Sequence, residues 1–232
     1  MEGKNPFFTL KSHFLEKFED NYRQRGLRNQ LVKKLRQKGI LDEKVLAAIA
    51  KVPRHVFFDG ALLTHAYEDK AFPIGEGQTI SQPYTVAFQT EKLQVKPGDK
   101  VLEVGTGSGY QAAVLLELGV KLYTIEYNRK LYEKTKAMLP QLGYNPFFLH
   151  GDGSKGLPAK APFDKIIVTA GAPIVPAALT EQLAEGGCMI IPVGDQEKPA
   201  MLRITKKNGK LVKEEFDNFA FVPLLGAHGW KS

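Results

Sequence analysis

The spacing of hydrophobic residues changes along the chain, and with it the secondary structure that the sequence predicts. Residues 29–38 place apolar side chains three and four positions apart between cations, which predicts an amphipathic helix ending at Gly39. Asp42 is a residue type that favours the helix N-cap, and it introduces a second predicted helix over residues 44–51. Residues 1–70 are therefore expected to be mainly helical.

Residues 72–84 have no periodicity and are rich in Gly, Pro, Thr and Ser, so they are expected to form a loop before a helix at 83–93. From residue 100 onward, short β-branched runs alternate with helical segments. The predicted strands are 100–104, 121–126, 147–150, 165–169 and 188–193, and the helices between them are 110–118, 129–139 and 176–183. This alternation is typical of parallel strands joined by right-handed crossovers.

The pattern changes again near the C-terminus. Asn208-Gly209 predicts a tight hairpin between strands at 201–206 and 210–216, because both turn residues must adopt positive φ. Residues 219–224 are expected to add a last strand. The predicted fold class is therefore α/β, a doubly wound and mostly parallel sheet with an antiparallel C-terminal hairpin and N-terminal helices.

We find no internal repeat and no low-complexity linker, so one domain is expected over residues 1–232. Within it we distinguish a variable extension (1–20), N-terminal helices with a loop (21–95) and a cofactor-binding sheet (96–232). Four phenylalanines in the extension could form a membrane-surface face, but packing against the domain or disorder is the favoured interpretation. They are Phe7, Phe8, Phe14 and Phe18.

The composition is that of an ordinary globular protein, with 43% hydrophobic and 25% charged residues. No apolar run approaches the roughly 20 residues that span a bilayer, so no membrane segment is expected. The single cysteine, Cys188, excludes a disulfide framework, and we expect it to be a core residue of a protein in the reducing cytoplasm. The net charge of +7 is concentrated between residues 22 and 40. An RNA-binding surface is one interpretation of these cations, and a solvated helix face is the favoured one.

A glycine-rich turn follows the predicted strand at 100–104. Glycines let the backbone turn sharply and approach a ligand that a Cβ would block. The spacing fits the methyltransferase pattern E/D-x-G-x-G-x-G, with its positions at Glu103, Gly105, Gly107 and Gly109. A dinucleotide fingerprint would instead place its third small residue at Tyr110. The turn therefore favours S-adenosylmethionine, since an acidic residue at the strand end suits the sulfonium charge.

Two further acids follow the next two predicted strands. Glu126 lies about 20 residues past the turn, where a carboxylate can accept both ribose hydroxyls. Asp152, followed by Gly153, is placed to bond the adenine amino group. A solvated strand-end acid or an ordinary turn residue is the alternative for each alone. Three such signals on successive strand ends favour a cofactor site.

At these motifs the chain resembles the protein-L-isoaspartate O-methyltransferase family. Residues 73–84 match its P-I-G-x-G-Q-T-I-S-Q-P-Y segment, and the 79–81 loop is the specific signal because general methyltransferases lack it. Further matches are V-P-R-H-x-F at 52–57, G-G-x-x-x-x-P-V-G at 186–194 and F-V-P-L at 221–224. The resemblance covers residues 23–225.

The resemblance implies a seven-stranded Rossmann-like methyltransferase fold, with S-adenosylmethionine as donor and S-adenosylhomocysteine as product. It implies that Ser81 is the active-site serine. The implied cofactor contacts are Glu103, Gly105, Gly107, Gly109, Glu126, Asp152 and Gly153. The implied substrate contacts are Thr79, Ile80, Ser81, Gln82, Val222, Pro223 and Leu224. Glu76 stands where the family often has histidine, and Ala220 where many members have arginine, so the peptide preference stays open.

The implied reaction is methylation of the free α-carboxylate of L-isoaspartyl residues in damaged proteins and peptides, whose ester then cyclises to a succinimide. Such a carboxylate has a pKa of about 3.5–4 and is ionised at neutral pH, so no general base is needed. Alignment and exclusion of water can then lower the barrier by roughly 7–11 kcal/mol. Our hypothesis is that the Ser81 hydroxyl or backbone N–H orients the carboxylate. Its structural alternative is a helix N-cap before Pro83.

Other functions make different demands on the sequence. A methyltransferase acting on RNA or a small molecule is the closest alternative, but amino-methylating nucleic-acid enzymes usually carry N/D-P-P-Y/F where residues 169–173 read T-A-G-A-P. A non-catalytic scaffold would tolerate a degenerate glycine turn, and this turn is intact. His55, His65 and His150 have no ligand spacing, so no metal is expected. The expected partners are isoaspartyl proteins and peptides, without an obligate nucleic acid or membrane, and a monomer is favoured.

Overall fold

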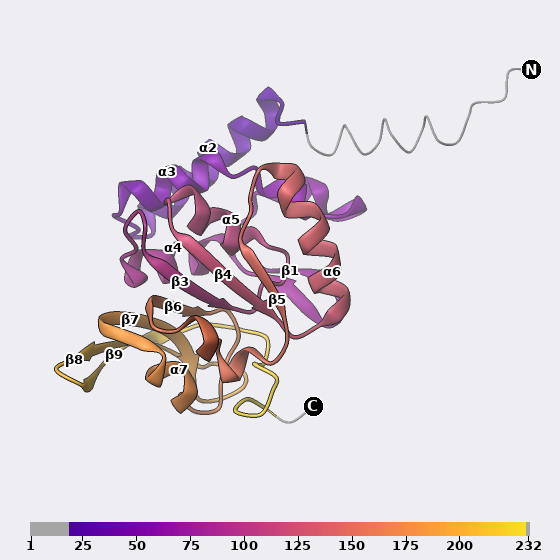
Figure 1. The fold of residues 1–232 in the computed structure, drawn as a ribbon. Coiled ribbons are helices and arrows are strands. Elements are labelled where there is room, and N and C mark those ends of the chain that lie inside the picture. The colour runs from indigo at the N-terminus through magenta and orange to yellow at the C-terminus, as the bar shows by residue number, and fades with distance from the viewer. Residues whose placement is uncertain (1–18, 231–232) are drawn as a thin grey trace, which may run out of the picture.

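The computed structural model describes residues 19–230, which form a central sheet with helices against both faces (Figure 1). The phenylalanines at positions 7, 8, 14 and 18 lie outside the described residues. Among the residues described, no helix combines the length and the apolar character that crossing a bilayer requires.

The main sheet has seven strands in the order β5-β4-β3-β6-β7-β8-β9. The strands from β5 to β7 run parallel, and β8 and β9 are antiparallel, so the predicted fold class is confirmed. Their bounds are β3 (Lys100–Val104), β4 (Lys121–Glu126), β5 (Phe147–His150), β6 (Phe163–Val168), β7 (Leu183–Val193), β8 (Ala200–Lys207) and β9 (Lys210–Asn218). After β3 the chain adds β4 and β5 on one side of that strand, and it then adds β6 and β7 on the other side. The order of the strands therefore reverses between β3 and β6. Ligands of doubly wound folds bind beyond the strand ends at such a point.

The helices follow the predicted pattern with shifted ends. Their bounds are α2 (Tyr22–Gln37), α3 (Glu43–Lys51), α4 (Pro83–Leu93), α5 (Tyr110–Glu117), α6 (Arg129–Met138) and α7 (Ala177–Glu181). Short 3-10 turns lie at Arg54–Phe57, Gly60–His65, Leu139–Leu142, Gly153–Lys155 and Pro158–Lys160. Helix α2 begins earlier than predicted because Asn21 caps it by accepting from the Gln24 N–H. The predicted Asp42 cap is confirmed by its bonds to the N–H groups of Lys44 and Val45.

Two hydrophobic clusters lie on opposite faces of the sheet. Val101 of β3 packs in the cluster that includes residues of α2 to α5, whereas Leu102 and Val104 pack in the cluster that includes Leu179 of α7. This alternation along one strand explains why the sheet is covered on both sides, because neighbouring side chains of a strand point to opposite faces. Cys188 is buried and unpaired in the first cluster, as predicted.

Two predictions about irregular segments were wrong. The expected loop at 72–84 contains an antiparallel pair, β1 (Phe72–Gly75) and β2 (Gln78–Ile80). Three consecutive residues of positive φ, Gly75 to Gly77, form the tight turn between the two strands. The strands themselves are too short to show a hydrophobic period in the sequence. The expected strand at 219–224 does not form; residues there make only the isolated bridge of Pro223 with Gly171. Pro223 has no N–H to donate to a ladder.

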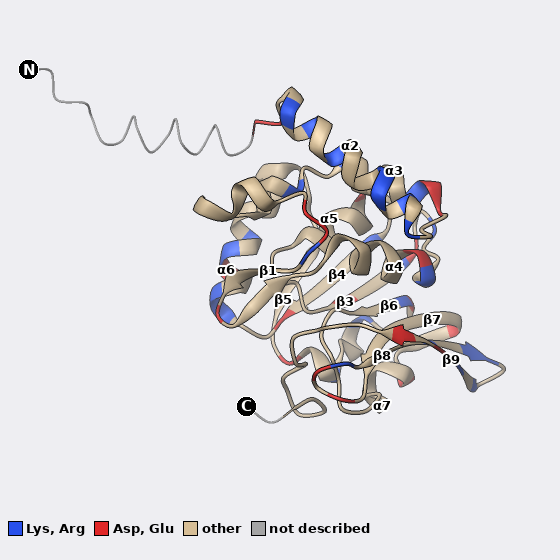
Figure 2. Ribbon diagram, turned by 180° about the vertical axis from the view of Figure 1, so that it is seen from behind, with Lys and Arg blue, Asp and Glu red and all other residues tan. Residues whose placement is uncertain are grey.

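The basic segment lies along α2 (Figure 2). Several of its cations are paired with acids: Arg25 and Arg28 with Asp20, Arg36 with Glu43, and Lys38 with Asp69. This pairing favours the interpretation of α2 as an ordinary helix face that is partly neutralised by its own protein.

Candidate active site

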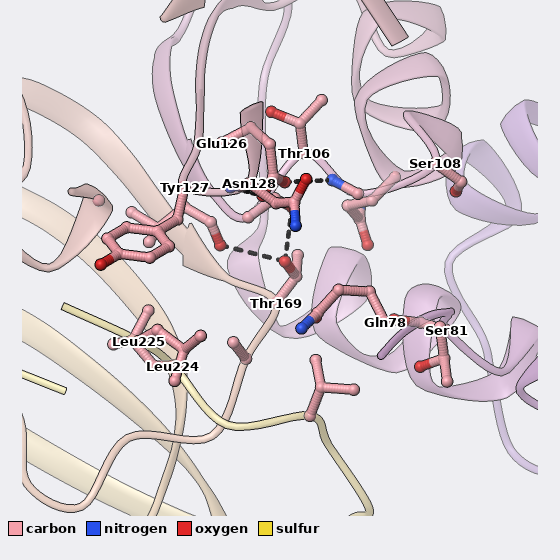
Figure 3. A pocket seen from close by; sticks show the side chains of 18 of the residues that line it. Gln78, Ser81, Thr106, Ser108, Glu126, Tyr127, Asn128, Thr169, Leu224 and Leu225 are labelled. Carbon is pink, nitrogen blue, oxygen red and sulfur yellow. Dashed lines mark hydrogen bonds between the residues drawn. The ribbon is translucent and has the colours of Figure 1, made fainter. Parts of the chain in front are cut away.

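A cavity of about 360 Å³ opens at the carboxyl ends of β3, β4 and β6. In Figure 3, Glu126, Tyr127 and Asn128 lie along one side of it, with Gln78 and Ser81 on a second side and Leu224 and Leu225 on a third. The cavity lies at the strand-order reversal, and it brings together segments that are far apart in the sequence.

The glycine turn after β3 forms part of the cavity wall and depends on residues without a Cβ. Gly105 has a φ of +98°, and a Cβ there would lie 2.4 Å from the Thr169 hydroxyl oxygen. That hydroxyl donates to the carbonyls of Gly105 (2.6 Å) and Val104 (3.0 Å), which joins the turn to the end of β6. Gly105 and Gly107 line the cavity, as their predicted role requires. Gly109 does not, because it begins α5 and lies against Thr135 and Leu139 of the next helical segment.

Glu126 is 6% exposed and faces the cavity with a fixed carboxylate (Figure 3). One oxygen accepts the Gly107 N–H and the other the Asn128 N–H, both at 2.8 Å. A carboxylate held by two backbone donors keeps further lone pairs for a ligand's hydroxyl groups. This geometry agrees with the predicted ribose contact, which stays a prediction.

Glu103 lies beneath the turn and does not line the cavity. Its side chain is fully buried next to Thr124 on β4, whose hydroxyl donates to it at 2.6 Å and also bonds Thr106 (2.6 Å). Burial raises the pKa of Glu103 to about 8, so the carboxyl is mainly protonated at neutral pH. A mainly protonated acid outside the cavity lining is poorly placed to attract a sulfonium by charge, so the cofactor contact of Glu103 stays a prediction. Hydrogen bonds connect its carboxyl to the cavity through Thr124 and Thr106.

Asp152 and Gly153 differ in their relation to the cavity. Gly153 lines it, and a Cβ there would lie 2.6 Å from a Val104 methyl carbon. Asp152 instead holds the C-terminal segment, because its carboxylate accepts the Ser154 and Ala227 N–H groups and the Ser154 hydroxyl. Burial alone would raise the pKa of Asp152, but these hydrogen bonds outweigh it and lower the pKa. An adenine contact through this side chain stays a prediction, and the structure gives the carboxylate other partners.

The predicted substrate loop lies on the side of the cavity away from Glu126. Thr79, Ile80 and Ser81 line it, whereas Gln82 is turned away and donates to the Asp69 carbonyl (3.1 Å). The N-cap residue of α4 is Gln82, with no side-chain cap, so the alternative of Ser81 as a helix N-cap is wrong. The Ser81 carbonyl accepts a hydrogen bond from Arg54 at 2.9 Å.

The C-terminal segment completes the cavity. Val222, Pro223 and Leu224 all line it, although they form no strand. Two hydrogen bonds of 2.8 Å with the backbone of Gly171 hold this segment across the end of β6, one from the Leu224 N–H and one to the Val222 carbonyl. The Trp230 indole also donates to the Gly171 carbonyl at 3.0 Å.

The two departures from the family pattern lie at the edge of the site. Glu76 lines the cavity and pairs with Lys130 of α6 at 3.0 Å. The hydrogen bond from Lys130 holds the pKa of Glu76 below its usual range. Ala220 is exposed and outside the lining.

Sequence reasoning missed several lining residues, among them Gln78, Thr106, Tyr127, Asn128 and Thr169. Four of these follow a strand of the sheet: Thr106 follows β3, Tyr127 and Asn128 follow β4, and Thr169 follows β6. Position at the carboxyl end of a parallel strand was therefore the signal that could have identified them.

Comparison with known proteins identifies the same family that the sequence motifs resemble. A family model described as protein-L-isoaspartate(D-aspartate) O-methyltransferase matches residues 26–229. A protein-L-isoaspartate O-methyltransferase of Cytophaga hutchinsonii is 60% identical, covering 92% of this chain and 97% of its own length. One from Christiangramia forsetii is 59% identical, covering 89% and 98%.

Solved structures give the same result. A protein-L-isoaspartate O-methyltransferase structure aligns with a TM-score of 0.79 and 32% identity, covering 87% of this chain and 67% of its own. A Plasmodium falciparum structure assigned to the same group, in complex with S-adenosyl-L-homocysteine, aligns with a TM-score of 0.74 and 27% identity, covering 85% and 98%.

Proposed function

The chain belongs to the protein-L-isoaspartate(D-aspartate) O-methyltransferase family, and on that premise we propose that its cavity places an isoaspartyl carboxylate between Ser81 and the cofactor site. The protein is an S-adenosylmethionine-dependent enzyme that methylates the free α-carboxylate of L-isoaspartyl residues and so starts their repair through a succinimide. The observation that carries our assignment of the site is one cavity lined by both the glycine turn and the Ser81 loop.

The residues present fit S-adenosylmethionine. Glu126 offers a fixed acceptor for ribose hydroxyls, and Gly105 and Gly153 keep the wall open where a Cβ would fill it or strike a neighbour. Val104 and Ile125 add apolar surface suited to a base. When bound, S-adenosylmethionine supplies an electrophilic methyl group carried on a sulfonium.

The chain's own residues act by positioning. The substrate carboxylate is ionised at neutral pH, so the protein has no proton to remove before the transfer. We propose that the Ser81 hydroxyl or N–H donates to one carboxylate oxygen and leaves the other directed at the cofactor. Thr79, Ile80 and the Val222–Leu224 segment then cover the peptide and keep water from the reacting atoms.

We further propose that the protein is a cytoplasmic monomer acting on isoaspartyl proteins and peptides. Its only cysteine is unpaired, which suits a reducing compartment. Among residues 19–230, only two of the large exposed apolar side chains share an element, which is β9. The full set is Tyr22, Leu41, Tyr127, Phe147, Ile174, Leu211 and Val212. Sedimentation at twice the chain mass of 25.7 kDa would contradict the monomer.

Transfer of a labelled methyl group tests the function directly. The protein is incubated with S-adenosylmethionine carrying a tritiated methyl and with an isoaspartyl peptide, its aspartyl twin or bulk RNA. We expect base-labile label on the isoaspartyl peptide alone, because an ester of its free α-carboxylate is hydrolysed by base. Label on RNA would instead support the alternative nucleic-acid methyltransferase, and equal labelling of both peptides would contradict the proposed substrate.

A further inference from the structure

Arg54 is a fully buried cation beside the active site. It belongs to the 3-10 turn after α3 and has no exposed surface. Burial lowers the pKa of Arg54 to about 10, so the guanidinium is still charged at neutral pH. No carboxylate within residues 19–230 forms an ion pair with it, although Arg28, the other buried arginine, is paired with Asp20.

The contacts of Arg54 are backbone carbonyls and aromatic rings. Its Nε donates to the Ala66 carbonyl at 3.0 Å, and Nη2 donates to the Ser81 carbonyl at 2.9 Å. The guanidinium lies 4.6 Å from the centroid of the Tyr110 ring. Nη1 is buried without a hydrogen-bond partner among the described residues. The charge is thus partly solvated by dipoles and by a ring. Asp69 interacts with it electrostatically but forms no ion pair with it, and that carboxylate is paired with Lys38.

Two of these neighbours connect Arg54 to both halves of the site. Ser81 lines the cavity on the substrate side, and Tyr110 lines it directly after the glycine turn. A buried charge without an ion-pair partner costs free energy on folding, and an anion placed nearby in a region of low dielectric constant recovers part of that cost. The ligand expected beside Ser81 is such an anion.

We infer that Arg54 is a positioning residue that fixes Ser81 through its carbonyl and makes the adjacent cavity selective for an ionised carboxylate over a neutral group. This inference rests on the proposed function, since it takes the isoaspartyl carboxylate as the anion. It assigns Arg54 no contact with the substrate. The charge acts across the Ser81 loop, and the hydrogen bond keeps the loop in place.

A pair of peptides separates this role from a merely structural one. They are identical except that the isoaspartyl α-carboxylate of one is a neutral carboxamide in the other, and their binding to the protein loaded with S-adenosylhomocysteine is measured by calorimetry. We expect the wild type to bind the carboxylate about tenfold more tightly. Arg54→Gln should reduce this preference to about twofold or less, because the variant has no charge, and should change the affinity for S-adenosylhomocysteine by no more than about threefold.

Arg54→Lys keeps the charge but cannot hold two carbonyls with one planar fork. We expect it to retain most of the preference for the carboxylate while kcat falls, so it decides the matter should Arg54→Gln not fold. The matched control is Arg28→Gln, which removes a buried arginine that also donates to a backbone carbonyl, that of Ala50, and should leave the preference unchanged.

Two results would overturn the inference. One is a wild-type preference that persists in Arg54→Gln, and the other is a preference lost in a folded Arg54→Lys. Failure of the proposed function gives a different result, because the wild type itself would then neither methylate the isoaspartyl peptide nor distinguish it from the carboxamide.

Discussion

Replacing Ser81 with alanine is expected to lower kcat on an isoaspartyl peptide by about 100-fold, the size of effect seen when one preorganised donor is removed from an active site. The hydroxyl lies on the cavity wall and does not cap α4, so its loss removes a donor without unfolding the helix start. The affinity for S-adenosylhomocysteine should stay within about twofold, since the glycine turn and Glu126 are untouched. Steady-state kinetics and calorimetry on the same preparation measure the two quantities.

Glu126→Gln is the matched contrast to this variant. Its side chain has the same size, but it replaces a carboxylate that accepts two backbone N–H groups. It should weaken cofactor affinity, with a smaller change in kcat once the cofactor is saturating. Equal losses of turnover and cofactor affinity in Ser81→Ala would refute the assignment of Ser81 to the substrate carboxylate.

The regular part of the fold was predictable because its signals are local. The β-branched run at 100–104 predicted β3, and the glycine turn after it predicted where the cavity wall lies. Asn208-Gly209 predicted the β8–β9 hairpin. The two segments whose structure was predicted wrongly, 72–84 and 219–224, depend on contacts that the local sequence does not reveal. Strands β1 and β2 are too short to show a hydrophobic period. Residues 222–224 are held in place by two hydrogen bonds with the backbone of Gly171.

The site residues could be predicted from the sequence where the residue type and its position in the pattern indicate the role. A glycine that needs positive φ and an acid at a strand end can be recognised without coordinates, and Gly105 and Glu126 line the cavity. Asp152 shows the limit of this reasoning, because its partner Ala227 is 75 residues away in the sequence. Arg54 is a second case: its hydrogen bond to Ser81 crosses 27 residues and involves a carbonyl, which every residue carries.

Glu103 is the acid whose environment differs most from what its position suggested. Its pKa is raised by burial to about 8, from 4.5 in the unfolded chain. Between these values the folded protein holds a proton that the unfolded chain has lost, so this group makes stability fall as the pH rises from about 4.5 to 8. At about 1.4 kcal/mol per pKa unit, the loss across the window is roughly 5 kcal/mol.

Glu103→Gln should remove this loss. Glutamine resembles the protonated carboxyl in shape and can still accept from the Thr124 hydroxyl, but it does not ionise. We expect the free energies of unfolding of variant and wild type to agree within about 1 kcal/mol at pH 5 and the variant to be more stable by several kcal/mol at pH 9. Urea unfolding at five pH values between these limits gives the difference, from which the titration of all other groups cancels.

Glu133→Gln is the control, because the Glu133 side chain is 60% exposed on α6 and its one ion pair within residues 19–230 is with Arg129 at the surface. Its difference from the wild type should be small and nearly independent of pH. The same Glu103 variant also tests whether that acid attracts the sulfonium by charge. A mainly neutral Glu103 implies that the ratio of affinities for S-adenosylmethionine and S-adenosylhomocysteine is the same in variant and wild type at pH 7. A constant stability difference between pH 5 and 9, together with a selective loss of S-adenosylmethionine affinity, would mean that the buried carboxyl is ionised and acts on the cofactor directly.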